Sequence, residues 1–100
     1  MWLASAIVRT MFMARLGELL QDARDRAGLS QGALAEQLGC DQSLVSRVER
    51  ANRAVSVEEL FIWAEKLGLD QNEFMAGVVE EWHALRDGSG SIWLAEADPQ

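Results

Sequence analysis

The chain is poor in the residues that most enzyme and metal sites need. Its 100 residues include a single cysteine, Cys40, a single histidine, His83, one proline, Pro99, and no tyrosine. A lone cysteine excludes a disulfide within the chain and favours a reducing compartment, which we take to be the cytoplasm. One cysteine and one histidine far apart in sequence do not make a zinc cluster, and no serine has a neighbouring histidine. We therefore expect no enzymatic activity, no metal and no other cofactor.

Long apolar runs are also missing, since no segment approaches the roughly 20 residues needed to span a bilayer. Apolar residues make up 49 % of the chain and charged residues 25 %, an ordinary balance for one globular domain. We place that domain at residues 13–86. Residues 1–12 form an apolar extension, either a helical continuation, residues upstream of a natural start at Met13, or a contact arm for a second subunit. Residues 87–100 form a tail, in which Trp93 belongs either to a clip onto the core or to a partner anchor.

Charge is unevenly distributed along the chain. The net charge of −7 argues, taken alone, against binding to nucleic acid. Residues 1–54, however, hold seven arginines and six acidic residues, whereas residues 55–100 hold two basic and ten acidic residues. A neutral-to-basic half beside an acidic half can still present a locally positive face, so the overall charge does not exclude a nucleic-acid partner.

The pattern of apolar residues predicts an all-α fold of five helices. No proline interrupts the chain before Pro99, and no segment shows the two-residue alternation of a strand. Glycines that end apolar-periodic runs, followed by capping residues, place the helices at about 13–27, 31–38, 42–50, 57–67 and 71–86. The expected caps are Ser30, Asp41, Ser56 and Asp70. The apolar residues at helical spacing, which we expect to form the core, are Leu16, Leu19, Leu20, Ala23, Ala27, Leu34, Ala35, Leu38, Leu44, Val45, Val48, Val57, Leu60, Trp63, Ala64, Leu67, Phe74, Val78, Trp82 and Leu85.

The second and third predicted helices are short and are joined by only three residues, Gly39, Cys40 and Asp41. This spacing is typical of a helix-turn-helix, in which the first helix crosses the duplex backbone and the second enters the major groove. Cys40 should point inward in such a turn, and we interpret it as a core residue because free cysteines are usually buried. We interpret Asp41 as a helix cap.

The run LSQGALAEQLGCDQSLVSRVER, which begins at Leu29, resembles the Cro/lambda-repressor-like family of bacterial and phage regulators, also called the xenobiotic-response-element type. The resemblance covers about residues 15–75 and includes the later segment SVEEL…AEKLGL. It implies a five-helix domain that binds double-stranded DNA, usually as a dimer, and controls transcription, most often as a repressor. It also implies a location in the bacterial cytoplasm, at the nucleoid.

The same resemblance implies roles for individual polar residues. The positions that match the family's base-reading residues, at the start of the third helix and one turn later, are Gln42, Ser43, Ser46 and Arg47. The positions that match its phosphate contacts are Gln31, Arg50, Asn52 and Arg53. We interpret Glu49 as an intramolecular partner of an arginine rather than as a base reader.

Two positions depart from the family pattern. Ala51 replaces the glycine that commonly follows the third helix, where a left-handed backbone conformation costs a residue other than glycine about 1 kcal/mol. Either Ala51 keeps that conformation or Asn52 adopts it. Val55 replaces a common proline before the fourth helix. Both changes concern the path of the 51–56 loop.

Surplus apolar residues in the acidic half predict a self-association surface. Phe61, Ile62, Met75 and Val79 lie beside the expected core stripes of the fourth and fifth helices. We expect a homodimer, although the extension or the Trp93 tail could cover these residues within one chain. A second hypothesis is an antitoxin-like or co-regulator module that uses this surface and binds DNA weakly or not at all.

Overall fold

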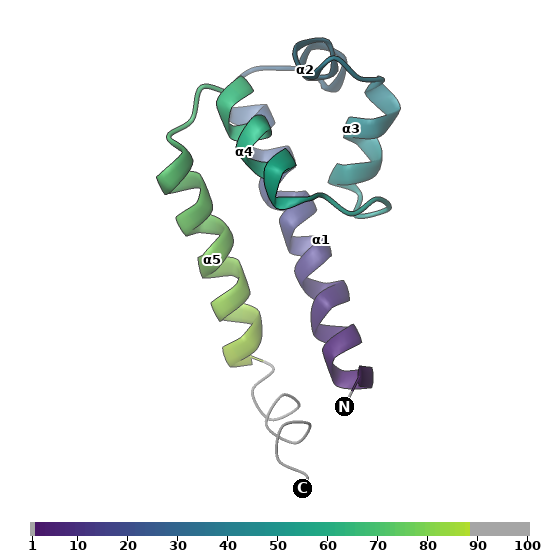
Figure 1. Cartoon of the computed structure of the whole chain (residues 1–100), viewed down its shortest axis with the longest axis vertical. Helices are drawn as coiled ribbons and strands as arrows, with labels where there is room; N and C mark the ends of the chain where they lie inside the picture. Colours follow the sequence, from purple (N-terminus) through teal and green to yellow (C-terminus); the bar gives the residue numbers. More distant parts are fainter. Residues whose placement is uncertain (1, 89–100) are drawn as a thin grey trace, which may run out of the picture.

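The computed structural model describes residues 2–88, and these residues form five helices without a strand. They are α1 (Trp2–Arg26), α2 (Gln31–Leu38), α3 (Gln42–Glu49), α4 (Val57–Lys66) and α5 (Gln71–Gly88). Figure 1 shows α1 and α5 as two long antiparallel helices, with α4 in front of α1 and with α2 and α3 at one end. The all-α prediction is confirmed, and the helix bounds agree within two residues except at the start of α1.

The first helix is longer than the sequence pattern predicted, because α1 begins at Trp2 rather than near residue 13. Val8 is buried, and the ring of Phe12 meets that of Trp82 in α5 edge-to-face, with ring centroids 5.4 Å apart. Of the alternatives for residues 1–12, a helical continuation of the first helix is the one observed for residues 2–12. Ile7 and Met11 remain exposed on this part of α1.

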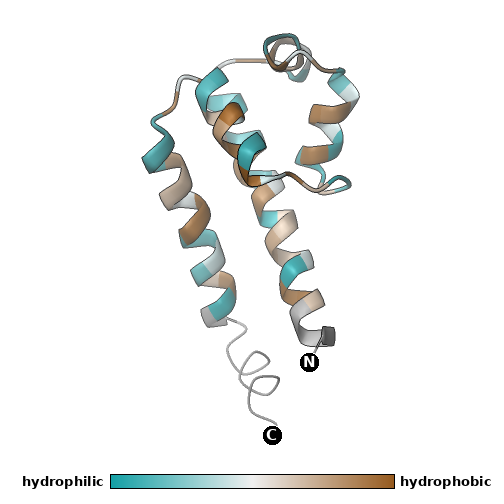
Figure 2. Ribbon diagram, viewed as in Figure 1, coloured by the Kyte–Doolittle hydropathy of each residue, from teal (hydrophilic) through white to brown (hydrophobic). Residues whose placement is uncertain are grey.

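One hydrophobic core joins the five helices. Leu20, Leu34, Val45 and Ala64 are fully enclosed, and Trp63 is only 3 % exposed. Figure 2 shows hydrophobic bands alternating with hydrophilic ones along the helices, as expected for elements that bury one face. Two predicted core residues are wrong: Ala27 is exposed just beyond the end of α1, and Val57 is 63 % exposed because it lies in the first turn of α4.

Four helix ends use the same hydrogen-bonding pattern, in which a left-handed residue lets two backbone N–H groups bond back into the last turn. Three of these ends carry glycine, for example Gly39 with φ 74° after α2. The fourth, after α3, carries Ala51 with φ 61°, and there the N–H groups of Ala51 and Asn52 donate to the carbonyls of Val48 and Arg47. Ala51 therefore keeps the left-handed conformation, and the alternative that Asn52 adopts it is wrong.

We expect Ala51→Gly to raise the free energy of unfolding by about 1 kcal/mol, because glycine adopts a positive φ without a steric penalty. Urea denaturation followed by circular dichroism measures the change. The matched control is Ala76→Gly, at an exposed position inside α5, which should lower stability by a similar amount. Equal effects of the two substitutions would contradict the strain that we assign to Ala51.

Within residues 2–88, none of the five helices combines the length and the apolar character that crossing a membrane requires.

Candidate nucleic-acid interface

Helices α2 and α3 form a helix-turn-helix whose turn is fixed at both ends. The Ser30 side chain accepts a hydrogen bond from the N–H of Ala33 at the start of α2, which confirms the predicted cap. The left-handed Gly39 ends α2, and Asp41 then enters α3 with an extended backbone. The Asp41 side chain makes no capping hydrogen bond, so that detail of the prediction is wrong. Its carboxylate is therefore left exposed at the start of α3.

The eight residues of α3 divide into a buried face and an exposed polar face. Val45, Val48 and Glu49 are buried against the body of the domain. The predicted base-reading residues lie on the other side: Gln42, Ser43 and Arg47 are exposed, and Ser46 is half-buried. Their spacing of three to four residues places them along one side of the helix. Figure 1 shows the first part of α1 beside α5 rather than over α3, so residues 2–12 leave this face open.

A buried ion pair holds the end of α3 to the end of α1. Arg24 and Glu49 are 7 % and 5 % exposed, and two hydrogen bonds of 2.6 and 3.0 Å run from the guanidinium to the carboxylate. Arg24 also donates to the carbonyl of Leu29, at 2.7 Å. The bond to Glu49 raises the pKa of Arg24 above its ordinary value, so the pair stays charged. The interpretation of Glu49 as an intramolecular partner is confirmed.

The Glu49 carboxylate also positions a predicted phosphate contact. The side-chain amide of Gln31, the first residue of α2, donates to Oε1 of Glu49 at 2.9 Å. One amide hydrogen is used in this bond, and the other is left for an acceptor outside the domain. Glu49 thus connects α1, α2 and α3. The sequence gave no signal for Arg24, because its partner is 25 residues away.

The approach of α1 to α3 depends on a glycine that the sequence pattern did not single out. A Cβ atom on Gly17 would lie 2.5 Å from the carbonyl oxygen of Glu49 and 3.1 Å from that of Val48. Both are backbone atoms of the last turn of α3, which cannot rotate away as a side chain could. Gly17 therefore sets the distance between the two helices and, with it, the position of α3.

Two arginines on the exposed side of α3 carry positive charge that no described carboxylate neutralises. Among residues 2–88, neither Arg47 nor Arg50 has an acidic group within ion-pair distance. Each instead donates from Nε to a carbonyl of its own helix, Arg47 to Ser43 and Arg50 to Ser46, at 3.3 and 3.4 Å. The terminal nitrogens of both guanidinium groups project from these anchored stems. The nearby acid Glu49 is already paired with Arg24, so the local charge is positive.

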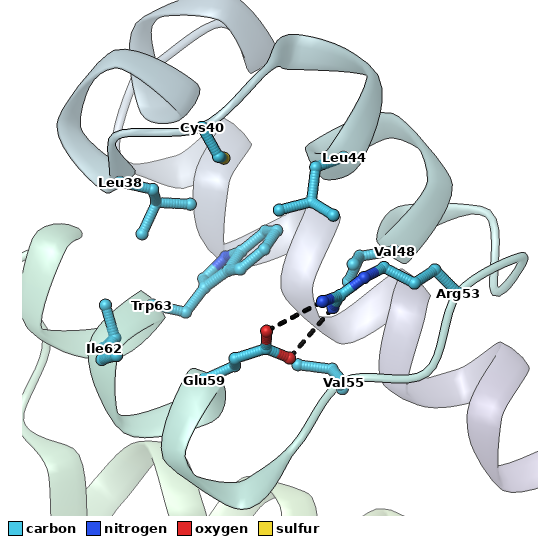
Figure 3. Close-up of a pocket in the computed structure, with 9 residues that line it drawn as sticks. All are labelled: Leu38, Cys40, Leu44, Val48, Arg53, Val55, Glu59, Ile62 and Trp63. Atoms are coloured by element: carbon cyan, nitrogen blue, oxygen red, sulfur yellow. Dashed lines mark hydrogen bonds and ion pairs between the residues drawn. The ribbon is translucent and has the colours of Figure 1, made fainter.

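Arg53 is placed differently from Arg47 and Arg50. Its guanidinium makes two hydrogen bonds, of 3.0 and 3.1 Å, to the carboxylate of Glu59 (Figure 3). Glu59 also accepts from the backbone N–H of Ser56, which caps α4 in return. The hydrogen bonds from Arg53 and Ser56 hold the pKa of Glu59 below its usual value. Arg53 thus fastens the 51–56 loop to α4, and a phosphate would have to share it with Glu59.

The other sequence-predicted residues are located as follows. Asn52 is exposed in the loop, and its backbone N–H closes the end of α3. Cys40 is half-buried against the core, where burial and Asp41 raise the pKa of its thiol, so it is protonated near neutral pH. Among residues 2–88, no three His, Cys, Asp or Glu side chains are grouped to hold a metal ion.

The predicted self-association residues are partly exposed. Phe61, Ile62 and Val79 are each about 40 to 50 % exposed, whereas Met75 packs against the core. The Trp93 tail lies outside the described residues. The sequence reading did not single out Ile7 and Met11, which add exposed apolar surface on α1.

Comparisons with known proteins agree with this geometry. Residues 15–76 match the family model of a helix-turn-helix domain. Among solved structures, an XRE-family like protein from Pseudomonas syringae pv. tomato str. DC3000 is similar, with a TM-score of 0.70 and 31% sequence identity; the match covers 77% of this chain and 94% of that one. No curated protein matches the chain. An exposed polar face on α3, a matching family model and a matching fold lead to one assignment: this chain belongs to the XRE-type, Cro/lambda-repressor-like family of helix-turn-helix DNA-binding proteins.

Proposed function

We propose that this protein is a sequence-specific regulator that inserts α3 into the major groove and represses transcription from promoters that overlap its site. The observation that carries the proposal is the exposed polar face of α3, where Arg47 and Arg50 have no acidic partner among residues 2–88. Gln42 and Arg47 are residue types that pair with adenine and guanine edges, respectively. Ser43 and Ser46 are small enough to let the helix backbone approach the bases.

Phosphate contacts would flank this face. Gln31 lies at the start of α2, where backbone N–H groups and the helix dipole also favour an anion. Arg50 and Asn52 lie at the opposite end of α3, next to the loop held by Arg53. Contacts at both ends would fix the register of α3 along the groove, while the residues between them read the sequence.

Fluorescence anisotropy with a duplex enriched from a random pool tests the proposal. We expect the selected duplex to bind at least a hundredfold more tightly than a scrambled one, since specific binding generally exceeds non-specific binding by this much or more. The affinity should fall with rising salt, with a log–log slope of about −0.9 for each phosphate neutralised. Failure to enrich any sequence at low salt would contradict the proposal.

We further propose that the protein binds as a homodimer through apolar surface remote from α3. The exposed side chains of Phe61, Ile62 and Val79 support this surface, because two modules on one duplex gain affinity through effective concentration. The same surface also favours the second candidate, an antitoxin-like or co-regulator module. Sedimentation of the purified chain separates the two: a dimer at micromolar concentration supports self-association, whereas a monomer that binds no duplex supports the second candidate.

A further inference from the structure

A partly open pocket of about 150 Å³ lies behind α3. Figure 3 shows its walls, which come from the end of α2, the turn, α3, the 51–56 loop and α4. Leu44 and Val48 of α3 face Val55 and Ile62 across it, so most of the lining is apolar. A cavity of about this volume accepts a benzene-sized molecule.

One wall of this pocket carries a buried hydrogen-bond donor without an acceptor. Trp63 is 3 % exposed, and its indole N–H has no partner among residues 2–88. Figure 3 shows the indole nitrogen on the edge of the ring nearer Leu38 and Ile62, two residues that line the pocket. Buried N–H groups are seldom left unpaired, because an unpaired donor loses its bond to water without compensation. The donor therefore calls for an acceptor that enters from the pocket.

The remaining polar groups of the lining favour an uncharged occupant. Arg53 and Glu59 neutralise each other through two hydrogen bonds, so neither offers an unpaired charge to a ligand. Burial and Asp41 keep the Cys40 thiol in its neutral form near pH 7. A charged ligand would lose its hydration here without a countercharge.

From this combination we infer a ligand site: the pocket binds a neutral molecule about the size of one six-membered ring, with a single hydrogen-bond acceptor placed to take the N–H of Trp63. The walls supply apolar contact, and the acceptor supplies orientation, which is the usual division in small-molecule sites. The site shares α3 and Arg53 with the candidate interface, but the inference rests on the pocket alone and does not require DNA binding.

A pair of matched probes tests the acceptor. Cyclohexanone and methylenecyclohexane have the same shape, but only the ketone accepts a hydrogen bond. We expect the ketone to bind the full chain about two- to tenfold more tightly and to move the Trp63 indole N–H signal downfield in nitrogen–proton NMR spectra. Phe substitutions of Trp2, Trp82 and Trp93 assign that signal by elimination. Equal affinities, or an indole signal that stays in place with the ketone, would overturn the inference.

A second experiment tests the location of the site. Ile62→Phe enlarges a partly exposed side chain that lines the pocket, and it should weaken ketone binding at least fivefold. Val57→Phe is the matched control, because Val57 is on the same helix, is exposed and does not line the pocket. Circular dichroism verifies that both variants fold. Ketone binding that is unchanged in Ile62→Phe would place the ligand elsewhere and overturn the assignment.

Discussion

Glu49→Ala should lower the free energy of unfolding by about 3–5 kcal/mol, because it leaves the buried guanidinium of Arg24 without its countercharge. Gln31 loses an acceptor in the same variant. A domain of this size is stable by roughly 5–15 kcal/mol, so the loss is a large fraction of the total. Urea denaturation followed by circular dichroism measures it.

Two variants distinguish the loss of the ion pair from other effects. Glu36→Ala removes an exposed acid from α2 and should change stability by less than about 0.5 kcal/mol. The double variant Arg24→Met, Glu49→Met removes both charges and should be clearly more stable than Glu49→Ala, since apolar pairs replace buried ion pairs well. A loss below 1 kcal/mol in Glu49→Ala would contradict the central place that we give to this carboxylate.

Gly17→Ala should destabilise the domain by about 2 kcal/mol, although alanine favours helices over glycine by about 1 kcal/mol. The added Cβ would lie 2.5 Å from the carbonyl oxygen of Glu49, so α1 and α3 must move apart. This movement would also pull on the buried pair between Arg24 and Glu49. Thermal and urea denaturation both measure the effect.

The chain supplies a matched control for Gly17→Ala. Gly77 lies inside α5, and a Cβ there meets nothing within 4 Å. Gly77→Ala should therefore raise stability by up to about 1 kcal/mol, from helix propensity alone. The two substitutions are chemically identical and are expected to have opposite signs. If both variants gained stability, the close contact between α1 and α3 would not constrain the fold.

Local signals in the sequence explain why the helices and their caps were predictable. Ser30 and Ser56 cap their helices through bonds to residues three positions away, so a short window of sequence contains both partners. The exposed face of α3 follows in the same way, because the helical period alone separates Arg47 from Val48. The start of α1 was missed because residues 2–12 are apolar almost throughout and show no clear stripe.

Features that depend on tertiary contacts were not predictable from the sequence. The ion pair between Arg24 and Glu49 joins residues that are brought together only when α1 crosses the end of α3. The role of Gly17 depends on the same crossing. Arg53 matched a phosphate-binding position, but its pairing with Glu59 required the path of the 51–56 loop. The sequence placed the functional face correctly on α3 but did not contain the contacts that hold α3 in place.

The central claim is that the exposed face of α3, rather than the charge of the whole molecule, binds the duplex. The most direct measurement compares the affinity of two double variants for the selected duplex. Arg47→Gln, Arg50→Gln removes two charges from α3, and Arg9→Gln, Arg15→Gln removes two exposed charges from α1. We predict that the α3 variant loses at least a hundredfold in affinity and the α1 variant less than threefold. Equal losses in the two variants would contradict the claim.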